Sequence, residues 1–186
     1  MEICNAAKGI IAIKKKNEKA VEILRAAIKD DDSLTIHLLP DIYPMGEERA
    51  VVRECLGIEL ETTQLPSAAN SVVINCETLL RITEAIEDKK PCFSKNMTVI
   101  GKINGGNQAH TFKDIPVGTS VADMIELAGG IAEPYGEIIM GGPFTGKATT
   151  LDAPTTKTTG GIIVTMEFPD LHGANVGLLV CACGGN

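Results

Sequence analysis

The chain has 186 residues, 44% of them hydrophobic, which suffices for one large globular domain or two small ones. It carries 17 Lys and Arg against 24 Asp and Glu, so the net charge is -7 and no basic face is expected to follow a nucleic-acid backbone. No apolar stretch reaches the roughly 20 residues that cross a bilayer, and no apolar export core follows the N-terminus. We expect a cytoplasmic protein without nucleic-acid partners or membrane insertion.

The first half of the sequence alternates between strand and helix patterns. Residues 9–13 form a plausible buried strand, and Asn17 is placed to cap a helix that runs through Ile28. The pattern then predicts a strand over 34–39, a helix over 46–56, a strand over 72–75 and a helix over 77–86. This βαβαβα order is typical of an α/β domain with a parallel sheet.

The pattern changes near Lys89-Lys90-Pro91, where we expect a domain boundary. Two β-rich runs flank Asn104-Gly105-Gly106-Asn107, which predicts a hairpin. Thr119 to Asp123 offers a capped start to a helix that ends at Gly129-Gly130, with one apolar face of Val121, Met124, Ile125 and Ala128. Strands over 137–140 and 161–168 complete a ββαββ order. We predict an α/β domain over 1–90, a small β-grasp (α+β) domain over 91–170 and a tail over 171–186.

Two stretches are candidates for cofactor binding, namely residues 42–49 and residues 72–79. Each joins an apolar run to a polar turn that opens a helix, which is how α/β proteins build sites for phosphate-bearing cofactors. From the residues alone, Glu47-Glu48 also fits a favourable charge at a helix N-terminus, and Asn75 also fits a simple helix cap. Both interpretations remain open at this point.

The cysteines divide into two groups. Cys4, Cys55, Cys76 and Cys92 are isolated, and we expect them to be reduced, small apolar residues. Cys181 and Cys183 form a Cys-x-Cys pair, which suits either a redox dithiol or the opening of a metal site. The spacing of Gly141, Gly146 and Lys147 resembles a P-loop, but Ala148 replaces the hydroxyl residue and no helix pattern follows. We predict a turn there, no His-based metal site and no catalytic group.

Several motifs resemble those of a known flavoprotein family. Tyr43-Pro44-Met45-Gly46, Met140-Gly141-Gly142-Pro143 and the run from Pro154 to Thr159 are close to RnfC. Gly46-Glu47-Glu48 and Asn75-Cys76-Glu77-Thr78 are closer to the NADH-oxidising flavin subunit of respiratory complex I. Within this family the chain is most similar to the PrdC group, RnfC-like proteins associated with D-proline reductase. The resemblance implies the later part of a flavin domain, followed by a soluble-ligand-binding β-grasp (SLBB) domain.

The resemblance also implies a site and a function. In the family, the residues that match this chain line a flavin mononucleotide (FMN) pocket: Tyr43, Gly46, Glu47, Glu48, Asn75 and Thr78. The nearby acidic pair would tune the flavin electrostatically. The family protein passes electrons from NADH through FMN and iron–sulfur or thiol centres to a reductase, here expected to be D-proline reductase, with other electron-transfer subunits as partners.

The chain also departs from the family pattern. The family's glycine-rich loop lies upstream of the region that Met1 matches, and Ile74 stands where the complex I subunit tends to have asparagine. Iron–sulfur ligands follow downstream in the family, and two sulfurs are too few for a cluster. We therefore expect a fragment of a longer electron-transfer protein, inactive with NADH and without bound FMN or cluster on its own. The alternative function is a non-catalytic β-grasp module that docks a ligand or partner.

Overall fold

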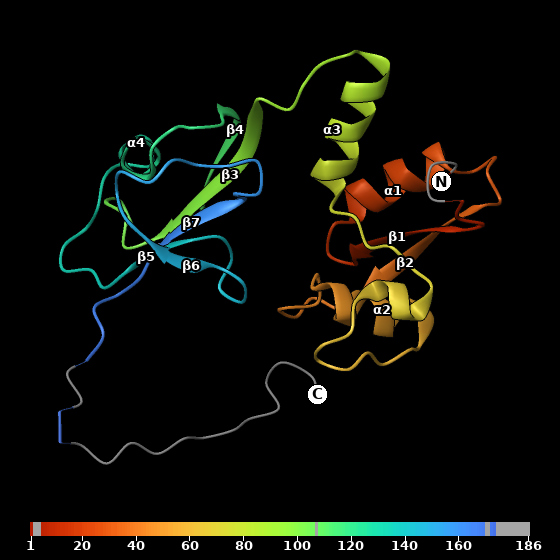
Figure 1. Ribbon diagram of the computed structural model, residues 1–186, viewed down its shortest axis with the longest axis horizontal. Helices are drawn as coiled ribbons and strands as arrows, with labels where there is room; N and C mark the ends of the chain where they lie inside the picture. Colours follow the sequence, from red (N-terminus) through yellow and green to blue (C-terminus); the bar gives the residue numbers. More distant parts are fainter. Residues whose placement is uncertain (2–4, 107, 170–171, 174–186) are drawn as a thin grey trace. The chain divides into compact units, whose positions relative to one another are not determined.

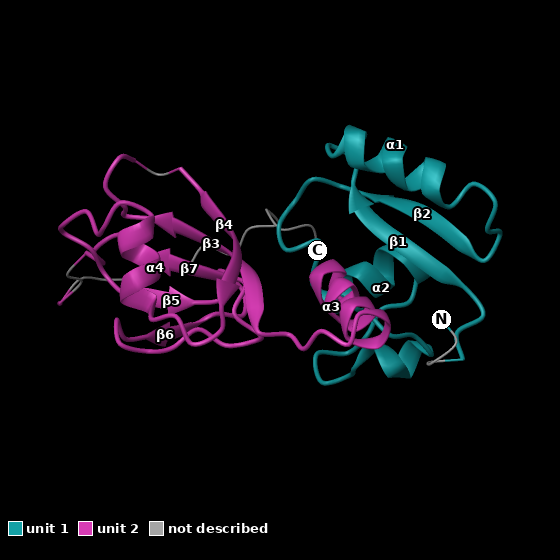
Figure 2. Cartoon of the chain, turned by 90° about the horizontal axis from the view of Figure 1, so that it is seen from above, with its two compact units in different colours: residues 1–74, 178–186 teal, residues 75–177 magenta. Residues whose placement is uncertain are grey.

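The structure, a computed structural model, describes residues 1, 5–106, 108–169 and 172–173. The described residues form two compact units (Figure 2). Unit 1 contains the described residues up to Ile74, and unit 2 contains those from Asn75 onward. Sequence analysis predicted a domain boundary near Lys89-Lys90-Pro91; the helix that precedes that point is grouped with unit 2.

Unit 1 is a small parallel α/β layer (Figure 1). Its elements are β1 (Gly9–Lys14), α1 (Glu18–Ala27), β2 (Leu34–Leu39), α2 (Glu48–Leu56) and the 3₁₀ helix η2 (Pro66–Ala69). Strands β1 and β2 are parallel, from the pair Gly9 and Leu34 to the pair Lys14 and Leu39. Figures 1 and 2 show α1 and α2 on opposite sides of this pair of strands. The predicted parallel βαβ order is therefore confirmed.

The core of unit 1 is small. Its buried hydrophobic side chains among the described residues are Val21, Leu39, Met45 and Val52. Each comes from a different segment: α1, the end of β2, the loop after β2, and α2. The loop that follows β2 is therefore anchored in the core by Met45, which is 3% exposed.

The strand predicted over 72–75 is wrong. Residues 71–75 have no regular secondary structure, and Val72 and Ile74 are 66% and 42% exposed. A short apolar run becomes a strand only where a partner strand accepts its hydrogen bonds, and the described sheet of unit 1 consists of β1 and β2 alone. The following helix, α3 (Cys76–Glu87), forms as predicted to within one residue at each end.

Unit 2 has a five-stranded mixed sheet in addition to α3. Its strands are β3 (Ser94–Gly101), β4 (His110–Pro116), β5 (Ile138–Met140), β6 (Lys147–Thr149) and β7 (Gly161–Val164), in the spatial order β4-β3-β7-β5-β6. Strands β3 and β7 are parallel neighbours, and the other pairs are antiparallel. The predicted β3–β4 hairpin is confirmed. Strand β6 was missed, and the last strand ends at Val164 instead of residue 168.

Helix α4 (Val121–Leu127) supplies one side of the core of unit 2. Ser120 caps it, because its hydroxyl accepts a hydrogen bond from the Asp123 N–H at 3.0 Å. The four residues predicted on its apolar face are all buried, at 0% to 4% exposure. They pack with Met97 and Val99 of β3 and Ile162 and Val164 of β7. A sheet wrapped around one helix is the predicted β-grasp arrangement, so the fold class is confirmed.

Candidate functional site

The loop between β2 and α2, together with the first residue of α2, holds four of the six residues predicted to bind a cofactor: Tyr43, Gly46 and Glu47 in the loop, and Glu48 in the helix. Backbone hydrogen bonds fold it tightly, from Met45 N–H to Ile42 O at 3.2 Å and from Glu47 N–H to Pro44 O at 2.7 Å. It follows the carboxyl end of a parallel strand and leads into a helix N-terminus, where open α/β sheets place ligand sites. Sequence reasoning therefore placed this group of residues correctly in the fold.

Glu47 caps helix α2. Its carboxylate accepts hydrogen bonds from the backbone N–H groups of Arg49 and Ala50 at 3.1 and 3.2 Å, and from Arg49 Nε at 3.1 Å. The helix accordingly begins at Glu48, two residues later than the predicted start at Gly46. Glu47 therefore lies at a helix N-terminus, as the charge interpretation requires, and the structure adds that its side chain caps the helix.

The exposed face of this loop fits a bound flavin. A Cβ built on Gly46 would meet no atom within 4 Å, so the backbone there is open to a ligand. The Tyr43 side chain is 53% exposed beside it, and Glu48 is exposed in the first turn of α2. An aromatic ring, an open backbone segment and a helix N-terminus are suited to stacking a flavin ring and holding its phosphate. The residues present in unit 1 are thus compatible with FMN.

A cluster of two lysines and one aspartate lies where β1 and β2 end. Asp41 Oδ1 forms ion pairs with Lys16 Nζ at 2.9 Å and with Lys14 Nζ at 3.2 Å. The hydrogen bond from Lys16 is the main reason that the pKa of Asp41 lies below its ordinary value. Sequence reasoning missed this cluster, although parallel pairing of the two strands brings their carboxyl ends together. The lysines are positive groups at the same edge as the Tyr43–Glu48 loop.

The remaining predicted residues, Asn75 and Thr78, belong to unit 2. Asn75 caps α3, because its Oδ1 accepts a hydrogen bond from the Glu77 N–H at 2.9 Å. Thr78 is exposed one residue after Glu77, in the first turn of the same helix. The structure therefore brings Tyr43, Gly46, Glu47 and Glu48 together in one unit, and Asn75 and Thr78 together in the other.

An ion-pair network attaches α3 to the β3–β4 hairpin, and sequence reasoning missed it. Glu77 accepts hydrogen bonds from Lys95 Nζ at 2.7 Å and from Asn96 N–H at 2.8 Å. Arg81, four residues along the helix, bonds Glu84 at 2.8 Å and Asp114 at 3.2 Å. Lys95 and Arg81 are 7% and 8% exposed. The spacing of Glu77, Arg81 and Glu84 is enough to predict ion pairs within the helix. The partners on β3 and β4 could not be predicted, because they depend on the tertiary structure.

The network should make the stability of unit 2 depend on pH. Burial opposes the charge of Glu77, but hydrogen bonds from Lys95 and Asn96 outweigh it, so the pKa of Glu77 is lowered. A carboxylate whose pKa is lowered by folding stabilises the folded state at pH values above the ordinary glutamate pKa of about 4.3. This contribution is lost as the pH falls through the folded-state pKa. Wild type should therefore exceed Glu77→Gln in free energy of unfolding at pH 7, and urea titrations should show the difference shrinking below about pH 4.3. A difference that stays constant to pH 3 would contradict this.

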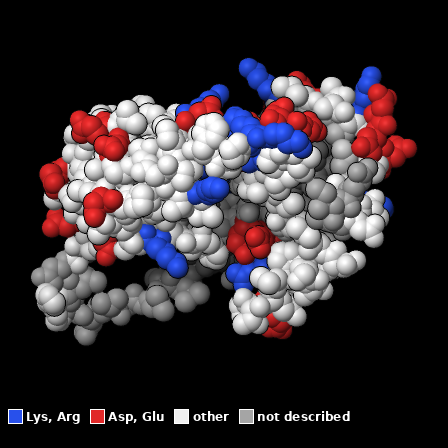
Figure 3. Space-filling model, turned by 45° about the horizontal axis from the view of Figure 1, so that its top comes forward, with Lys and Arg blue, Asp and Glu red and all other residues white. Residues whose placement is uncertain are grey.

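Cys55, Cys76 and Cys92 are free thiols, whereas Cys4, Cys181 and Cys183 lie outside the described residues. Within the described ranges, no cluster of three His, Cys, Asp or Glu side chains could hold a metal ion. No helix in the described part of the chain is both long and apolar enough to span a membrane. Figure 3 shows both acidic and basic side chains on the face drawn, with mainly acidic ones along its left-hand edge.

Comparison with known proteins gives matches to both units. Residues 1–84 match the family model described as the Nuo51 FMN-binding domain. The chain is 34% identical over 165 residues to cobalamin reductase PduS of Salmonella typhimurium, an alignment that covers 88% of this chain and 35% of PduS. It is 30% identical over 164 residues to the C subunit of the proton-translocating ferredoxin:NAD(+) oxidoreductase complex of Clostridium ljungdahlii, with 88% and 35% covered.

The corresponding C subunit of the Na(+)-translocating complex of Acetobacterium woodii is 29% identical over 164 residues, with 88% of this chain and 36% of that protein covered. The chain thus spans about a third of the length of these curated relatives. Because the alignments cover 88% of the chain, the similarity extends well beyond the 84 residues that match the FMN-binding domain and into unit 2.

Proposed function

We propose, because this chain is a homologue of RnfC-like electron-transfer proteins, that it is part of an oxidoreductase component that binds FMN and passes electrons from NADH to an acceptor. The match of residues 1–84 to an FMN-binding domain carries this proposal. When bound, FMN would accept a hydride from NADH and release its electrons singly. Iron–sulfur or thiol centres would take those electrons onward, and Cys181 and Cys183 are our candidates for redox thiols.

Each residue of the proposed site has a physical role. Tyr43 would offer its ring to the flavin, and Gly46 would let the backbone approach it, because no protein atom occupies the space beside it. The amino end of α2 favours negative charge and suits the flavin phosphate. Glu47 and Glu48 would adjust the electrostatic potential at the flavin, and Asn75 and Thr78 would add polar contacts. None of these residues needs to transfer a proton.

Two electron acceptors are candidates for the proposed protein. The resemblance to the PrdC group favours D-proline reductase, supplied through other electron-transfer or reductase subunits. The likeness to PduS favours a cobalamin acceptor as a second candidate, since PduS is named as a cobalamin reductase. A docking role for unit 2 remains compatible with both, because this unit has its own hydrophobic core and its relatives include subunits of larger complexes.

Flavin titration tests the proposed site. The whole polypeptide in which this sequence occurs should quench FMN fluorescence in a saturable way, and Tyr43→Leu should weaken binding at least about tenfold, by the loss of about 1.4 kcal/mol of stacking. Glu47→Gln keeps an oxygen for the helix cap but removes the charge, so it should shift the flavin reduction potential more than the affinity.

The matched control is Glu59→Gln, which removes an exposed charge of unit 1 outside the Tyr43–Glu48 loop. It should leave both FMN affinity and reduction potential unchanged. If the whole polypeptide does not bind FMN, or if Tyr43→Leu binds as tightly as wild type, the flavin site is wrong. NADH-dependent reduction of D-proline reductase compared with that of cobalamin, each with the same flavin-loaded protein, then decides between the acceptors.

A further inference from the structure

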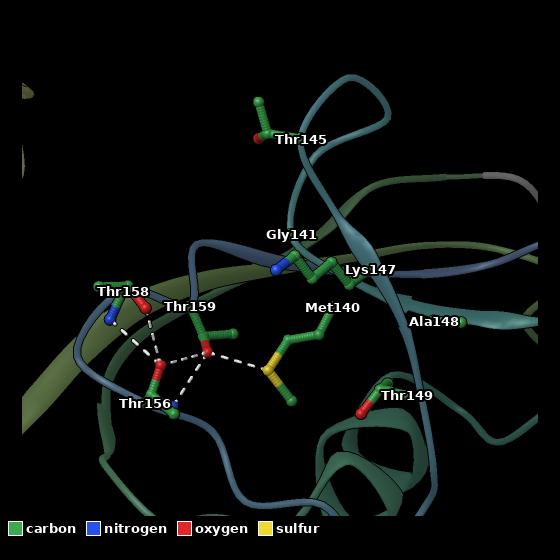
Figure 4. A pocket seen from close by; sticks show the side chains of 9 residues that line it. All are labelled: Met140, Gly141, Thr145, Lys147, Ala148, Thr149, Thr156, Thr158 and Thr159. Carbon is green, nitrogen blue, oxygen red and sulfur yellow. Dashed lines mark hydrogen bonds between the residues drawn. The ribbon is translucent and has the colours of Figure 1, made fainter.

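Unit 2 contains a pocket that none of the proposed flavin residues lines. Its volume is about 450 Å³, which is within the usual range for small-molecule sites. The walls come from the end of β5, the loop over 141–146, strand β6 and the turn over 156–159 (Figure 4). These segments belong to one unit, so the pocket does not depend on the placement of unit 1.

The lining of the pocket is rich in hydrogen-bond donors and positive. Five of its nine residues are threonines, and Lys147 contributes an ammonium group. None of the nine is an aspartate or glutamate. Figure 4 shows the Lys147 side chain extending from β6 towards the side on which Thr158 and Thr159 lie. In a chain of net charge -7, a pocket lined by one cation and hydroxyl groups favours an anionic ligand.

The hydroxyl groups of the 156–159 turn form a connected chain. Thr159, which is 3% exposed, donates to Met140 Sδ at 3.2 Å, and its oxygen accepts from Thr156 N–H at 2.9 Å. Thr156 Oγ1 lies 3.1 Å from Thr159 Oγ1 and 3.0 Å from Thr158 Oγ1. Because thioether sulfur is a weak acceptor, the Thr159 hydroxyl proton can turn towards a stronger acceptor at small cost. The exposed Thr158 hydroxyl is at the open end of the chain.

Close backbone packing fixes the opposite wall. A Cβ on Gly141 would lie 2.8 Å from Gly146 Cα, and a Cβ on Gly146 would lie 2.6 Å from Gly142 O. Gly141 N–H also donates to Gly161 O at 2.8 Å, which ties the loop to the start of β7. The loop that precedes Lys147 is therefore held in one shape, so the lysine starts from a defined position.

We propose that this pocket binds a small ligand through a phosphate group, with Lys147 Nζ as the cation and the Thr156, Thr158 and Thr159 hydroxyls as donors. A tetrahedral phosphate presents several acceptor oxygens, which suits a lining with one ammonium and several hydroxyl groups better than a neutral ligand does. The arrangement is not a P-loop, because strand β6 follows Lys147 in place of a helix. The pocket exceeds the volume of inorganic phosphate and leaves room for the rest of a metabolite.

NMR titration of the ¹⁵N-labelled chain tests this proposal at constant ionic strength. Inorganic phosphate and ribose 5-phosphate should each cause saturable shifts at Gly141, Lys147 and the 156–159 turn, and neutral ribose should cause none. Lys147→Met keeps the strand and the apolar stem but removes the charge, and it should weaken binding about tenfold. Thr158→Val keeps the shape of the side chain and should weaken binding by a smaller factor.

The matched control is Lys157→Met, because Lys157 belongs to the same turn but does not line the pocket. It should leave the affinity unchanged, and the spectra of all variants report directly whether they fold. Absence of saturable shifts in wild type, equal binding by Lys147→Met, or binding of ribose as tight as that of ribose 5-phosphate would each overturn the proposal. None of these outcomes bears on FMN binding, which involves other residues.

Discussion

Replacing Glu77 by alanine should lower the free energy of unfolding of unit 2 by about 3 kcal/mol. The change removes the carboxylate that Lys95 Nζ and Asn96 N–H both bond, and Lys95 is 7% exposed. A buried ammonium without its counter-ion and a backbone N–H without its acceptor each carry a desolvation penalty. The β3–β4 register shifts between Lys95 and Met97, so the ladder pattern is irregular where Glu77 bonds Asn96.

Urea unfolding, followed through NMR signals of core residues such as Val99 and Ile162, measures this loss. The matched control is Glu87→Ala, at the exposed end of the same helix. It should change the free energy of unfolding by less than about 0.5 kcal/mol, as is usual for surface substitutions. A loss below about 1 kcal/mol for Glu77→Ala would mean that the network does not hold α3 to the hairpin.

Replacing Gly101 by alanine should destabilise unit 2 by about 3 kcal/mol or more. Gly101 has a φ of 112°, which L side chains rarely adopt, and a Cβ there would overlap the carbonyl oxygen of Val164. Gly101 pairs with Val164 where β3 meets β7, and Lys102 N–H donates to that same oxygen at 2.9 Å. The methyl group would push β3 away from β7, the central strand of the sheet.

The Gly106→Ala variant separates the cost of the backbone conformation from the cost of the clash with Val164. Gly106 has nearly the same φ, 111°, but a Cβ there would meet no atom within 4 Å. Its replacement therefore costs the backbone strain alone, about 1–2 kcal/mol, and should lower the midpoint of urea unfolding less than Gly101→Ala does. Equal losses for the two variants would show that contact between β3 and β7 is not what requires glycine at position 101.

The helices and strands that were predicted well from the sequence are those whose start and end are marked by nearby residues. The strand over 34–39 and helix α4 were placed closely because an apolar pattern and turn or cap residues mark their ends. The strand over 72–75 failed because strand formation depends on a partner. Strand β6 was missed because Lys147-Ala148-Thr149 is short and has no apolar alternation.

The candidate site was predictable to a similar degree. Glu47 and Asn75 could be assigned to helix starts because the signals for a helix start are local. Asn75 caps α3 as predicted, whereas Glu47 was predicted only as a charge at the start of α2 and proves to cap it. The partnership of Glu77 with Lys95 could not be predicted, because it joins a helix to a strand that the chain reaches only after a turn.

The position of β7 affects how the protein is made. Among the described residues this strand is the last along the chain, yet it lies between β3 and β5, so residue 98 pairs with residue 161. During synthesis, β3 and β4 can pair early, but the sheet cannot close until Val164 has left the ribosome. Until then, the apolar side chains of β3 and α4 lack the strand that covers them, and exposed apolar surface of this kind makes a nascent chain prone to aggregation.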